Sequence, residues 1–253
     1  MNRIALDIQG PLARITLNNL PLNVIDFQMM DELLGALQQL EQRREIAVVI
    51  ISGGERAFSA GVDVAVHTPD QIQTMLQKFH GVIGALVKFP RITIAEVHSV
   101  CMGGGAELAM MCDMVYTTPD AKWGFPEITL GCYPPVACAA LGAIIGQKRA
   151  AELVFTGRTF TGQQAAAWGL ANEAYPEDEL QEVIRGTLDH LLKLSPAALA
   201  VAKKAFYAWD SIHLDKGLAR AEKIYVEELM QTEDVKEGIA AWMQKRKPEW
   251  KGK

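Results

Sequence analysis

Two glutamates and a run of glycines are the residues of this chain whose types and spacing best suit chemistry. Gly103, Gly104 and Gly105 lie in the segment VHSVCMGGGAELAM, and Glu107 follows them in the same segment. Glycines between a buried strand and a helix let the backbone approach a ligand closely, and the first N–H groups of that helix carry a partial positive charge. The segment therefore predicts a site that stabilises negative charge.

The negative charge could belong to a phosphate or to an oxyanion that forms during a reaction. Phosphate-binding loops read GxxxxGK[ST], or GxGxxG with an acidic residue about twenty positions later, and neither pattern follows the buried segment here. Glu107 would also repel a phosphate. We therefore favour an oxyanion site that has a proton-transferring carboxylate beside it.

A second acid, Glu127, lies in the apolar segment AKWGFPEITLG. Taken alone, Glu107 could be a solvent-facing residue that interacts with the helix dipole, but its neighbours Leu108, Met110 and Met111 are apolar as well. Two buried carboxylates close together share a proton at neutral pH, because like charges in a low dielectric raise one of the two pKa values. Glu107 and Glu127 are therefore the predicted catalytic residues, one as acid and one as base.

Alternating strands and helices must position these residues. The alternation of apolar and polar residues predicts a hairpin over 3–8 and 12–17, and helical spacing predicts a helix from Phe27 to Leu40. Buried strands are expected at 46–51 and at 92–97, the second leading to the glycines, with a helix over about 69–86 between them. Helix starts are predicted at Thr161, Ser195 and Thr232.

The pattern divides the chain into a core over 1–194, which contains the site, and a helical region over 195–253. The apolar residues of the second region predict that it packs on the core or on another subunit. They include Phe206, Tyr207, Trp209, Ile224, Tyr225, Leu229, Ile239 and Trp242.

Composition excludes several classes of function. The chain has 253 residues, of which 49% are hydrophobic and 22% are charged, and its net charge is -5. We therefore expect no nucleic-acid partner and no anionic membrane surface. No apolar run reaches the roughly 18 to 20 residues that cross a bilayer, and no secretion signal is evident, so we expect a soluble, cytoplasmic protein.

No metal site is predicted. The four cysteines form no CxxC pair and are expected to be buried, reduced thiols. They are Cys101, Cys112, Cys132 and Cys138. The five histidines follow no metal or triad spacing, and they are His67, His80, His98, His190 and His213.

The combination of motifs resembles the crotonase, or enoyl-CoA hydratase/isomerase, superfamily over nearly the whole chain. The matching segments are AFSAGVDV, HSVCMGGGAELAMMCD, WGFPEITLG, FTGRTFTGQQAAAWGLANEAYP and MQKRKPEW. The resemblance implies an α/β fold, a spiral of strand-strand-helix turns like those of ClpP and crotonase, with a C-terminal helical region that builds homotrimers or homohexamers.

The resemblance also implies roles for single residues. The carbonyl oxygen of an acyl-CoA thioester would be held by the backbone N–H groups of Val62 and Gly104, and Glu107 and Glu127 would be the two glutamates of a hydratase. Coenzyme A is part of the substrate and not a separate cofactor. It would contact Ala60, Gly61, Val62 and Lys245. Lys245 could equally be a solvated charge near the C-terminus.

One segment departs from the pattern of the superfamily, and it bears on which acyl group the enzyme accepts. GCYPPVACAALGAIIG follows the second glutamate, and Pro135 offers no N–H where other hydratases have an amide. With VDVAVHTPD and the C-terminal motifs, the chain is most similar to hydratases of cyclohexa-1,5-diene-1-carbonyl-CoA from anaerobic aromatic degradation. A general enoyl-CoA hydratase, a double-bond isomerase and a non-catalytic binding protein are the alternatives.

Overall fold

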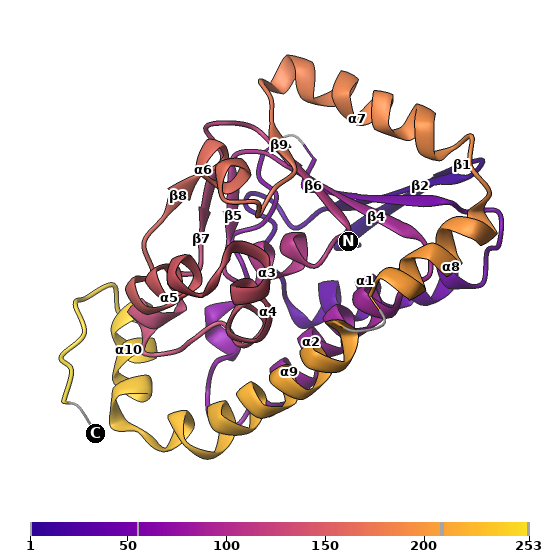
Figure 1. Cartoon of the computed structure of the whole chain (residues 1–253). Coiled ribbons are helices and arrows are strands. Elements are labelled where there is room, and N and C mark those ends of the chain that lie inside the picture. The colour runs from indigo at the N-terminus through magenta and orange to yellow at the C-terminus, as the bar shows by residue number, and fades with distance from the viewer. Residues whose placement is uncertain (1, 55, 208–209, 252–253) are drawn as a thin grey trace.

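The strands of the chain form two sheets in the computed structural model, which describes residues 2–54, 56–207 and 210–251 (Figure 1). One sheet has the strand order β1-β2-β3-β4-β6-β9, and the other has the order β5-β7-β8. The strands are β1 (Ile4–Gln9), β2 (Leu12–Leu17), β3 (Val48–Ser52), β4 (Ile92–Val97), β5 (Val100–Met102), β6 (Met114–Thr117), β7 (Lys122–Gly124), β8 (Phe160–Thr161) and β9 (Glu173–Ala174).

Helices cover the sheets and form the C-terminal region. The α-helices are α1 (Phe27–Glu41), α2 (Ile72–Lys88), α3 (Gly104–Met110), α4 (Pro135–Ile145), α5 (Gln147–Thr156), α6 (Gly162–Ala167), α7 (Glu177–Leu191), α8 (Pro196–Phe206), α9 (Asp210–Glu227) and α10 (Glu233–Met243). Three short 3-10 helices are η1 (Val64–Val66), η2 (Pro126–Leu130) and η3 (Leu229–Gln231).

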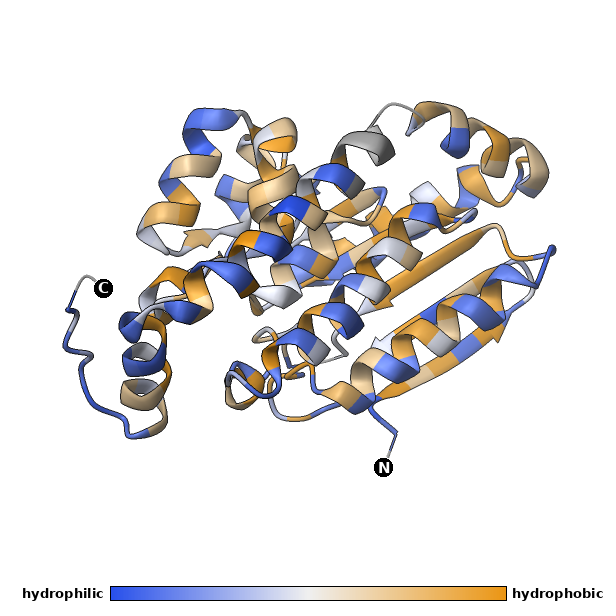
Figure 2. Cartoon of the chain, turned by 90° about the horizontal axis from the view of Figure 1, so that it is seen from below, coloured by the Kyte–Doolittle hydropathy of each residue, from blue (hydrophilic) through white to orange (hydrophobic). Residues whose placement is uncertain are grey.

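The inner strands β3 and β4 of the larger sheet are buried on both faces. Along β3, Val49 and Ile51 pack into the core that contains residues of α1 and α2, whereas Val48 and Ile50 pack with residues of α7. Successive side chains of a strand point to opposite faces, so a strand between two helical layers must be apolar throughout. Figure 2 shows these strands as largely hydrophobic ribbons beside helices of mixed character. The predicted buried strand is confirmed, and it begins two residues later than expected.

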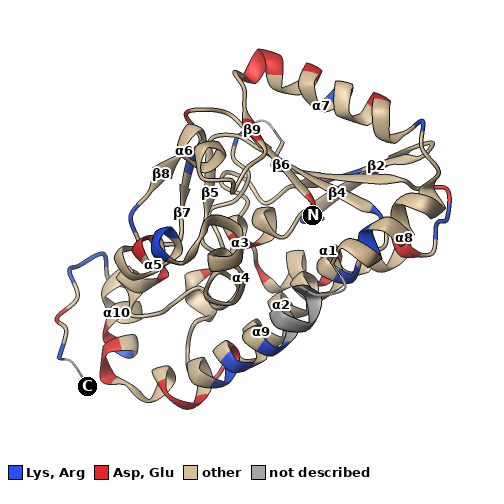
Figure 3. Cartoon of the chain, in the orientation of Figure 1, with Lys and Arg blue, Asp and Glu red and all other residues tan. Residues whose placement is uncertain are grey.

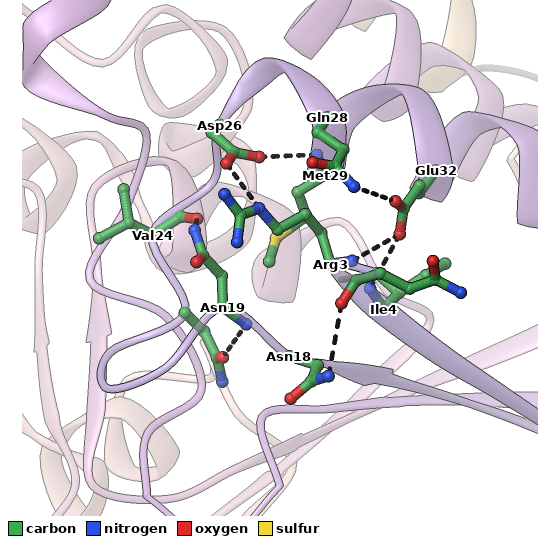
Figure 4. A network of polar contacts seen from close by, with 11 residues as sticks. Arg3, Ile4, Asn18, Asn19, Val24, Asp26, Gln28, Met29 and Glu32 are labelled. Atoms are coloured by element: carbon green, nitrogen blue, oxygen red, sulfur yellow. Dashed lines mark hydrogen bonds and ion pairs between the residues drawn. The ribbon is translucent and has the colours of Figure 1, made fainter.

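A polar network fixes the first helix against the first strand (Figure 4). The Asp26 side chain caps α1 by accepting from the Met29 N–H at 2.8 Å, and it also accepts from Arg3 Nε at 2.7 Å. Glu32 accepts from the backbone N–H groups of Arg3 and Ile4 at 2.7 and 3.0 Å. The predicted hairpin and first helix are thus both present and are joined to each other.

The other predicted helix starts are confirmed by their caps. Thr161 and Gln164 form a capping box at α6, in which each side chain bonds to the backbone of the other residue. The Ser195 hydroxyl accepts from Ala198 N–H at α8, and the Thr232 hydroxyl accepts from Val235 N–H at α10. These local signals position three helices of the second half of the chain.

The C-terminal helices lie partly on the core. Helix α9 packs against α4 and α2, and it brings Tyr225, which is 1% exposed, into the core. Phe206 and Trp242 are exposed instead, and Trp209 lies outside the described residues. Acidic and basic residues alternate along α9 (Figure 3). The division into 1–194 and 195–253, and the trimer, remain predictions.

Two expectations are corrected. The glycine run follows the short strand β5 of the second sheet, not β4 directly, because the chain crosses from one sheet to the other at residues 98–99. Cys138 is exposed, while the other three cysteines are buried thiols without disulfides. In the part of the chain that the structure describes, every helix is too short or too polar to cross a membrane.

Candidate active site

Both predicted catalytic glutamates face one small cavity. Glu107 on α3 and Glu127 on η2 line a space of about 80 Å³ together with residues of α2, α4 and α9. A larger cavity of about 500 Å³ lies between α3, α4, α6 and α8 and contains neither glutamate. The smaller cavity is the candidate active site, because it combines titratable groups with apolar walls and the predicted oxyanion-binding backbone.

Each glycine of the run makes room for a different neighbour. A methyl group on Gly103, whose φ is +51°, would lie 2.7 Å from Glu127 Oε1. One on Gly104 would lie 2.7 Å from Val62 Cγ2, and one on Gly105 would lie 2.6 Å from Ser59 Cβ. Real side chains do not approach so closely, so a larger residue at any of the three positions would force its neighbour to shift. The run therefore packs the start of α3 against both the second glutamate and the loop before η1.

The backbone N–H groups of Val62 and Gly104 lie close together. A methyl group on Gly104 would be 3.4 Å from Val62 N, and one on Gly61 would be 3.4 Å from Gly104 N. Neither N–H group has a backbone acceptor among the turn and loop hydrogen bonds of the described residues. Gly104 is the first residue of α3, so its N–H points out of the helix. The structure thus brings together the two amides that the sequence predicts for the oxyanion hole.

A buried asparagine holds the loop that presents Val62. The Asn23 side chain donates to the carbonyl oxygens of Gly53 and Ala57 at 2.7 and 2.8 Å, and its backbone carbonyl accepts from the Ser59 hydroxyl at 2.7 Å. The same hydroxyl accepts from Gly61 N–H at 3.0 Å. Buried polar groups that are bonded on all sides order the backbone around them. Asn23 is a positioning residue that the motifs alone do not reveal.

Burial changes the protonation of Glu107. Its side chain is 3% exposed, and burial raises its pKa to about 7. The backbone N–H groups at the start of α4 oppose this effect, and Ala137 N–H donates to Glu107 Oε1 at 2.9 Å. Pro135, at the first position of the same helix, lines the cavity. Glu107 is therefore a buried carboxyl group that can lose its proton near neutral pH.

The surroundings of Glu127 favour its neutral, protonated form. Burial, followed by the charge of Glu107, raises its pKa well above the usual value. Its Oε2 atom is buried and has no hydrogen-bond partner among the described residues. Its own backbone N–H opposes this rise only in part, so the proton that the pair shares resides mainly on Glu127.

The remaining predicted residues divide into two groups. Ala60, Gly61 and Val62 line the cavity, as a role in substrate binding requires. Lys245 is exposed, follows the end of α10 and is not among the residues that line the cavity. Its contact with coenzyme A remains a prediction.

Several residues of the cavity were not predicted for the site, and His80, Tyr133 and Tyr225 are three of them. His80 comes from α2 and Tyr225 from α9, while Tyr133 precedes α4. The Tyr133 hydroxyl donates to Ala221 O at 2.5 Å, and its ring lies 5.0 Å from that of Tyr225. No sequence motif connects these positions, since only the packing of α9 on α2 and α4 brings them together.

Comparison with known proteins shows the family of this chain. Residues 7–253 match the family model described as enoyl-CoA hydratase/isomerase. The chain is 30% identical to cyclohexa-1,5-dienecarbonyl-CoA hydratase of Thauera aromatica over 251 residues, which are 99% of this chain and 97% of that protein. It is 33% identical to 2,3-dehydroadipyl-CoA hydratase of Escherichia coli K12 over 252 residues, covering 99% and 95% of the two chains.

Solved structures show the same fold. The crystal structure of an enoyl-CoA hydratase from Mycobacterium avium subsp. paratuberculosis K-10 superposes with a TM-score of 0.88 at 25% identity, over 98% of each chain. The crotonase fold predicted from the sequence is thus confirmed. The chain is an enzyme of the enoyl-CoA hydratase/isomerase family.

Proposed function

We propose that this enzyme, a hydro-lyase, adds water to a conjugated enoyl- or dienoyl-CoA thioester, with cyclohexa-1,5-diene-1-carbonyl-CoA as its preferred substrate. One observation carries the proposal. Two buried glutamates with raised pKa values, Glu107 and Glu127, face a single cavity beside the N–H groups of Val62 and Gly104. A conjugate addition needs both parts of this arrangement.

The two amides would stabilise the charge that develops on the thioester. When water attacks the conjugated double bond, electrons move to the carbonyl oxygen and an enolate-like state forms. Donors preorganised around that oxygen lower the barrier by several kcal/mol, about 3 to 4 for each amide in comparable oxyanion holes. Val62 and Gly104 supply these donors from the backbone, so the charge is stabilised without any metal or redox cofactor in the proposed reaction.

The unequal surroundings of the two glutamates support distinct roles. Glu107, whose carboxylate is stabilised by Ala137 N–H, accepts the proton of the attacking water while the water oxygen bonds to the substrate carbon. Glu127, which holds the shared proton, donates it to the carbon of the enolate. The proton gained by one glutamate balances the proton lost by the other, and the pair then exchanges protons to return to its starting state.

The choice of a cyclic diene rests on similarity and on one residue of the cavity. The relative from Thauera aromatica carries this activity in its name. Pro135, which has no N–H, lines the cavity where the resemblance to other hydratases implies an amide that faces the water. The relative from Escherichia coli is named for a linear substrate at similar identity. A general enoyl-CoA hydratase is therefore the main alternative, and a double-bond isomerase is a second one.

A side-by-side assay with cyclohexa-1,5-diene-1-carbonyl-CoA and crotonyl-CoA tests the proposal. Enoyl absorbance and product mass are followed for each substrate at equal enzyme concentration. We expect the mass of one water to be gained with the cyclic diene at a kcat/KM well above that for crotonyl-CoA. Hydration of crotonyl-CoA alone would show a general hydratase, an unchanged mass with a moved double bond would show an isomerase, and binding without turnover would show a non-catalytic protein.

A further inference from the structure

We propose that the cavity contains a second polar subsite, formed by the Tyr225 hydroxyl and His80 Nε2, which binds a hydroxyl group on the acyl part of the substrate. This hydroxyl group is additional to the thioester oxygen and the added water. The inference rests on the proposed function, because its ligand is the acyl part of a coenzyme A thioester.

Both atoms are buried in the cavity without a protein partner. Tyr225 is 1% exposed and His80 is 8% exposed, and both line the same cavity as the two glutamates. Neither the Tyr225 hydroxyl nor His80 Nε2 has a hydrogen-bond partner among the described residues. The Cys132 thiol acts on the pKa of the tyrosine, but a thiol is a weak hydrogen-bonding group. Buried polar atoms of this kind normally have a partner, so these two atoms are matched to a ligand.

The two atoms come from neighbouring positions on the surface of the cavity. Glu222 and Tyr225 are three residues apart on α9, so their side chains lie on the same face of that helix. His80 Nδ1 on α2 lies 3.2 Å from Glu222 Oε2. His80 is therefore hydrogen-bonded to α9 one turn away from Tyr225, and in the proposed subsite one small group on the ligand contacts both.

The protonation states define what the subsite recognises. Burial lowers the pKa of His80, while Glu222 opposes this effect, so the imidazole is neutral at neutral pH. Because a carboxylate only accepts hydrogen bonds, Nδ1 must carry the proton and Nε2 must be an acceptor. Burial raises the pKa of Tyr225, whose hydroxyl therefore stays protonated and can donate. One acceptor beside one donor matches a hydroxyl group, which both donates and accepts.

The charges around the cavity select against an acidic acyl group. Glu107 and Glu127 face the cavity, and Glu222 lies directly behind His80. Of the described residues that line the cavity, none is a lysine or an arginine. A carboxylate on the acyl group would meet these acids without a cation to balance it, and it could not donate to His80 Nε2. A neutral hydroxyl group avoids both problems.

A purely hydrocarbon acyl group, such as the cyclic diene of the proposed function, would leave this subsite to water. Water can bond to Tyr225 and His80 before the substrate binds, but a hydrocarbon that displaces this water leaves both atoms unpaired. A hydroxyl group on the acyl part that replaces this water keeps both buried atoms paired, so it adds to the affinity without being required for binding. A hydroxylated ring should therefore bind more tightly than the same ring without oxygen.

Binding of non-reacting thioesters tests the subsite independently of catalysis. Calorimetry measures Kd for cyclohexanecarbonyl-CoA and for 3-hydroxy- and 4-hydroxycyclohexanecarbonyl-CoA with the full-length protein. The variants are Tyr225→Phe and the matched control Tyr133→Phe, whose hydroxyl lines the same cavity but is already bonded to the Ala221 carbonyl. We expect the wild type to bind one hydroxylated ring at least tenfold more tightly, Tyr225→Phe to lose most of this preference, and Tyr133→Phe to keep it.

Two results would overturn the subsite. One is equal affinity of the wild-type protein for all three thioesters, which needs no variant and so does not depend on whether Tyr225→Phe folds. The other is an unchanged hydroxyl preference in a folded Tyr225→Phe protein. Failure of the proposed function is separate: a protein that hydrates the diene without hydroxyl preference loses only the subsite, and one with the preference but no hydration loses only the reaction.

Discussion

The backbone N–H of Ala137 donates a 2.9 Å hydrogen bond to Oε1 of Glu107. Ala137 is the third residue of α4, so its N–H is one of those that a helix leaves without an internal acceptor. The helix thus places a donor and the positive end of its dipole at one glutamate of the pair. Glu127 instead has a buried Oε2 without a partner among the described residues, and its own backbone N–H only partly opposes the rise of its pKa. This difference separates the two carboxyl groups into a base and an acid.

Replacing either glutamate should stop hydration and leave the fold intact. Glu107→Gln cannot accept a proton from water, and Glu127→Gln cannot donate one to carbon, so kcat should fall by about 10²-fold or more in each. Calorimetry with a saturated acyl-CoA should give a Kd close to that of the wild type. Glu45→Gln, at an exposed position, is the control. Full activity in either active-site variant would contradict the two-carboxylate mechanism.

The pH profile of kcat/KM should reflect the ionisation of Glu107 and Glu127. Glu107 must be deprotonated to act as a base, and burial raises its pKa to about 7. Hydration should therefore become faster as the pH rises through about 7. The rate should fall again at higher pH where the pair loses its second proton, because Glu127 must be protonated and its pKa is raised further. A rate that is independent of pH between 5 and 9 would count against these roles.

Burial of Glu107 should make the wild type less stable at high pH. A carboxyl group whose folded pKa lies above its unfolded value binds more protons in the folded state, so the free energy of unfolding decreases as the pH rises from about 4.5 to 7. Glu107→Gln removes this loss and keeps an oxygen that can accept from Ala137.

Urea unfolding of both proteins at pH 5 and pH 8 measures the effect. We expect the variant to gain on the order of 3 kcal/mol relative to the wild type between the two pH values. An equal stability difference at the two pH values would show that Glu107 has an ordinary pKa.

Gly103→Ala should damage the site more than the fold. The residue has a φ of +51°, and a methyl group would lie 2.7 Å from Glu127 Oε1. The strain costs about 1 to 3 kcal/mol of stability, and the displaced carboxyl group should lower kcat by tenfold or more. Gly81→Ala on α2 is the control, because nothing lies within 4 Å of the added methyl group and helix propensity improves. Equal activity of the two variants would be inconsistent with the close approach of Glu127.

Lys203 should anchor α8 to the core. Its Nζ donates to Asp113 Oδ2 at 2.7 Å and to the Arg91 carbonyl at 2.8 Å, and the residue is 7% exposed. Lys203→Met leaves Asp113 with an unpaired buried charge and should lower the free energy of unfolding by about 3 kcal/mol. Chemical denaturation of the exposed neighbour variant Lys204→Met should show a change below about 0.5 kcal/mol. A similar loss of stability in the Lys203→Met and Lys204→Met variants would contradict the anchoring role of Lys203.

Local sequence signals determined most elements of the fold. Alternation of apolar residues predicted the hairpin, an apolar run predicted β3, and caps at Thr161, Ser195 and Thr232 located three helices, because these signals act between residues near in sequence. The glycine run and the acids after it also indicated the kind of chemistry. The sequence missed β5, because a three-residue strand is too short to show a period.

Only the tertiary structure decided how the two glutamates differ and what faces them. Glu107 and Glu127 look alike in sequence, and the packing of α4 gives one of them a backbone donor. Likewise, Tyr225 reads as an ordinary core residue until α9 packs over α2 and sets it in the cavity near His80. These hydrogen bonds join residues that are 30 apart in sequence for Glu107 and Ala137 and 142 apart for His80 and Glu222, and no local pattern contains them.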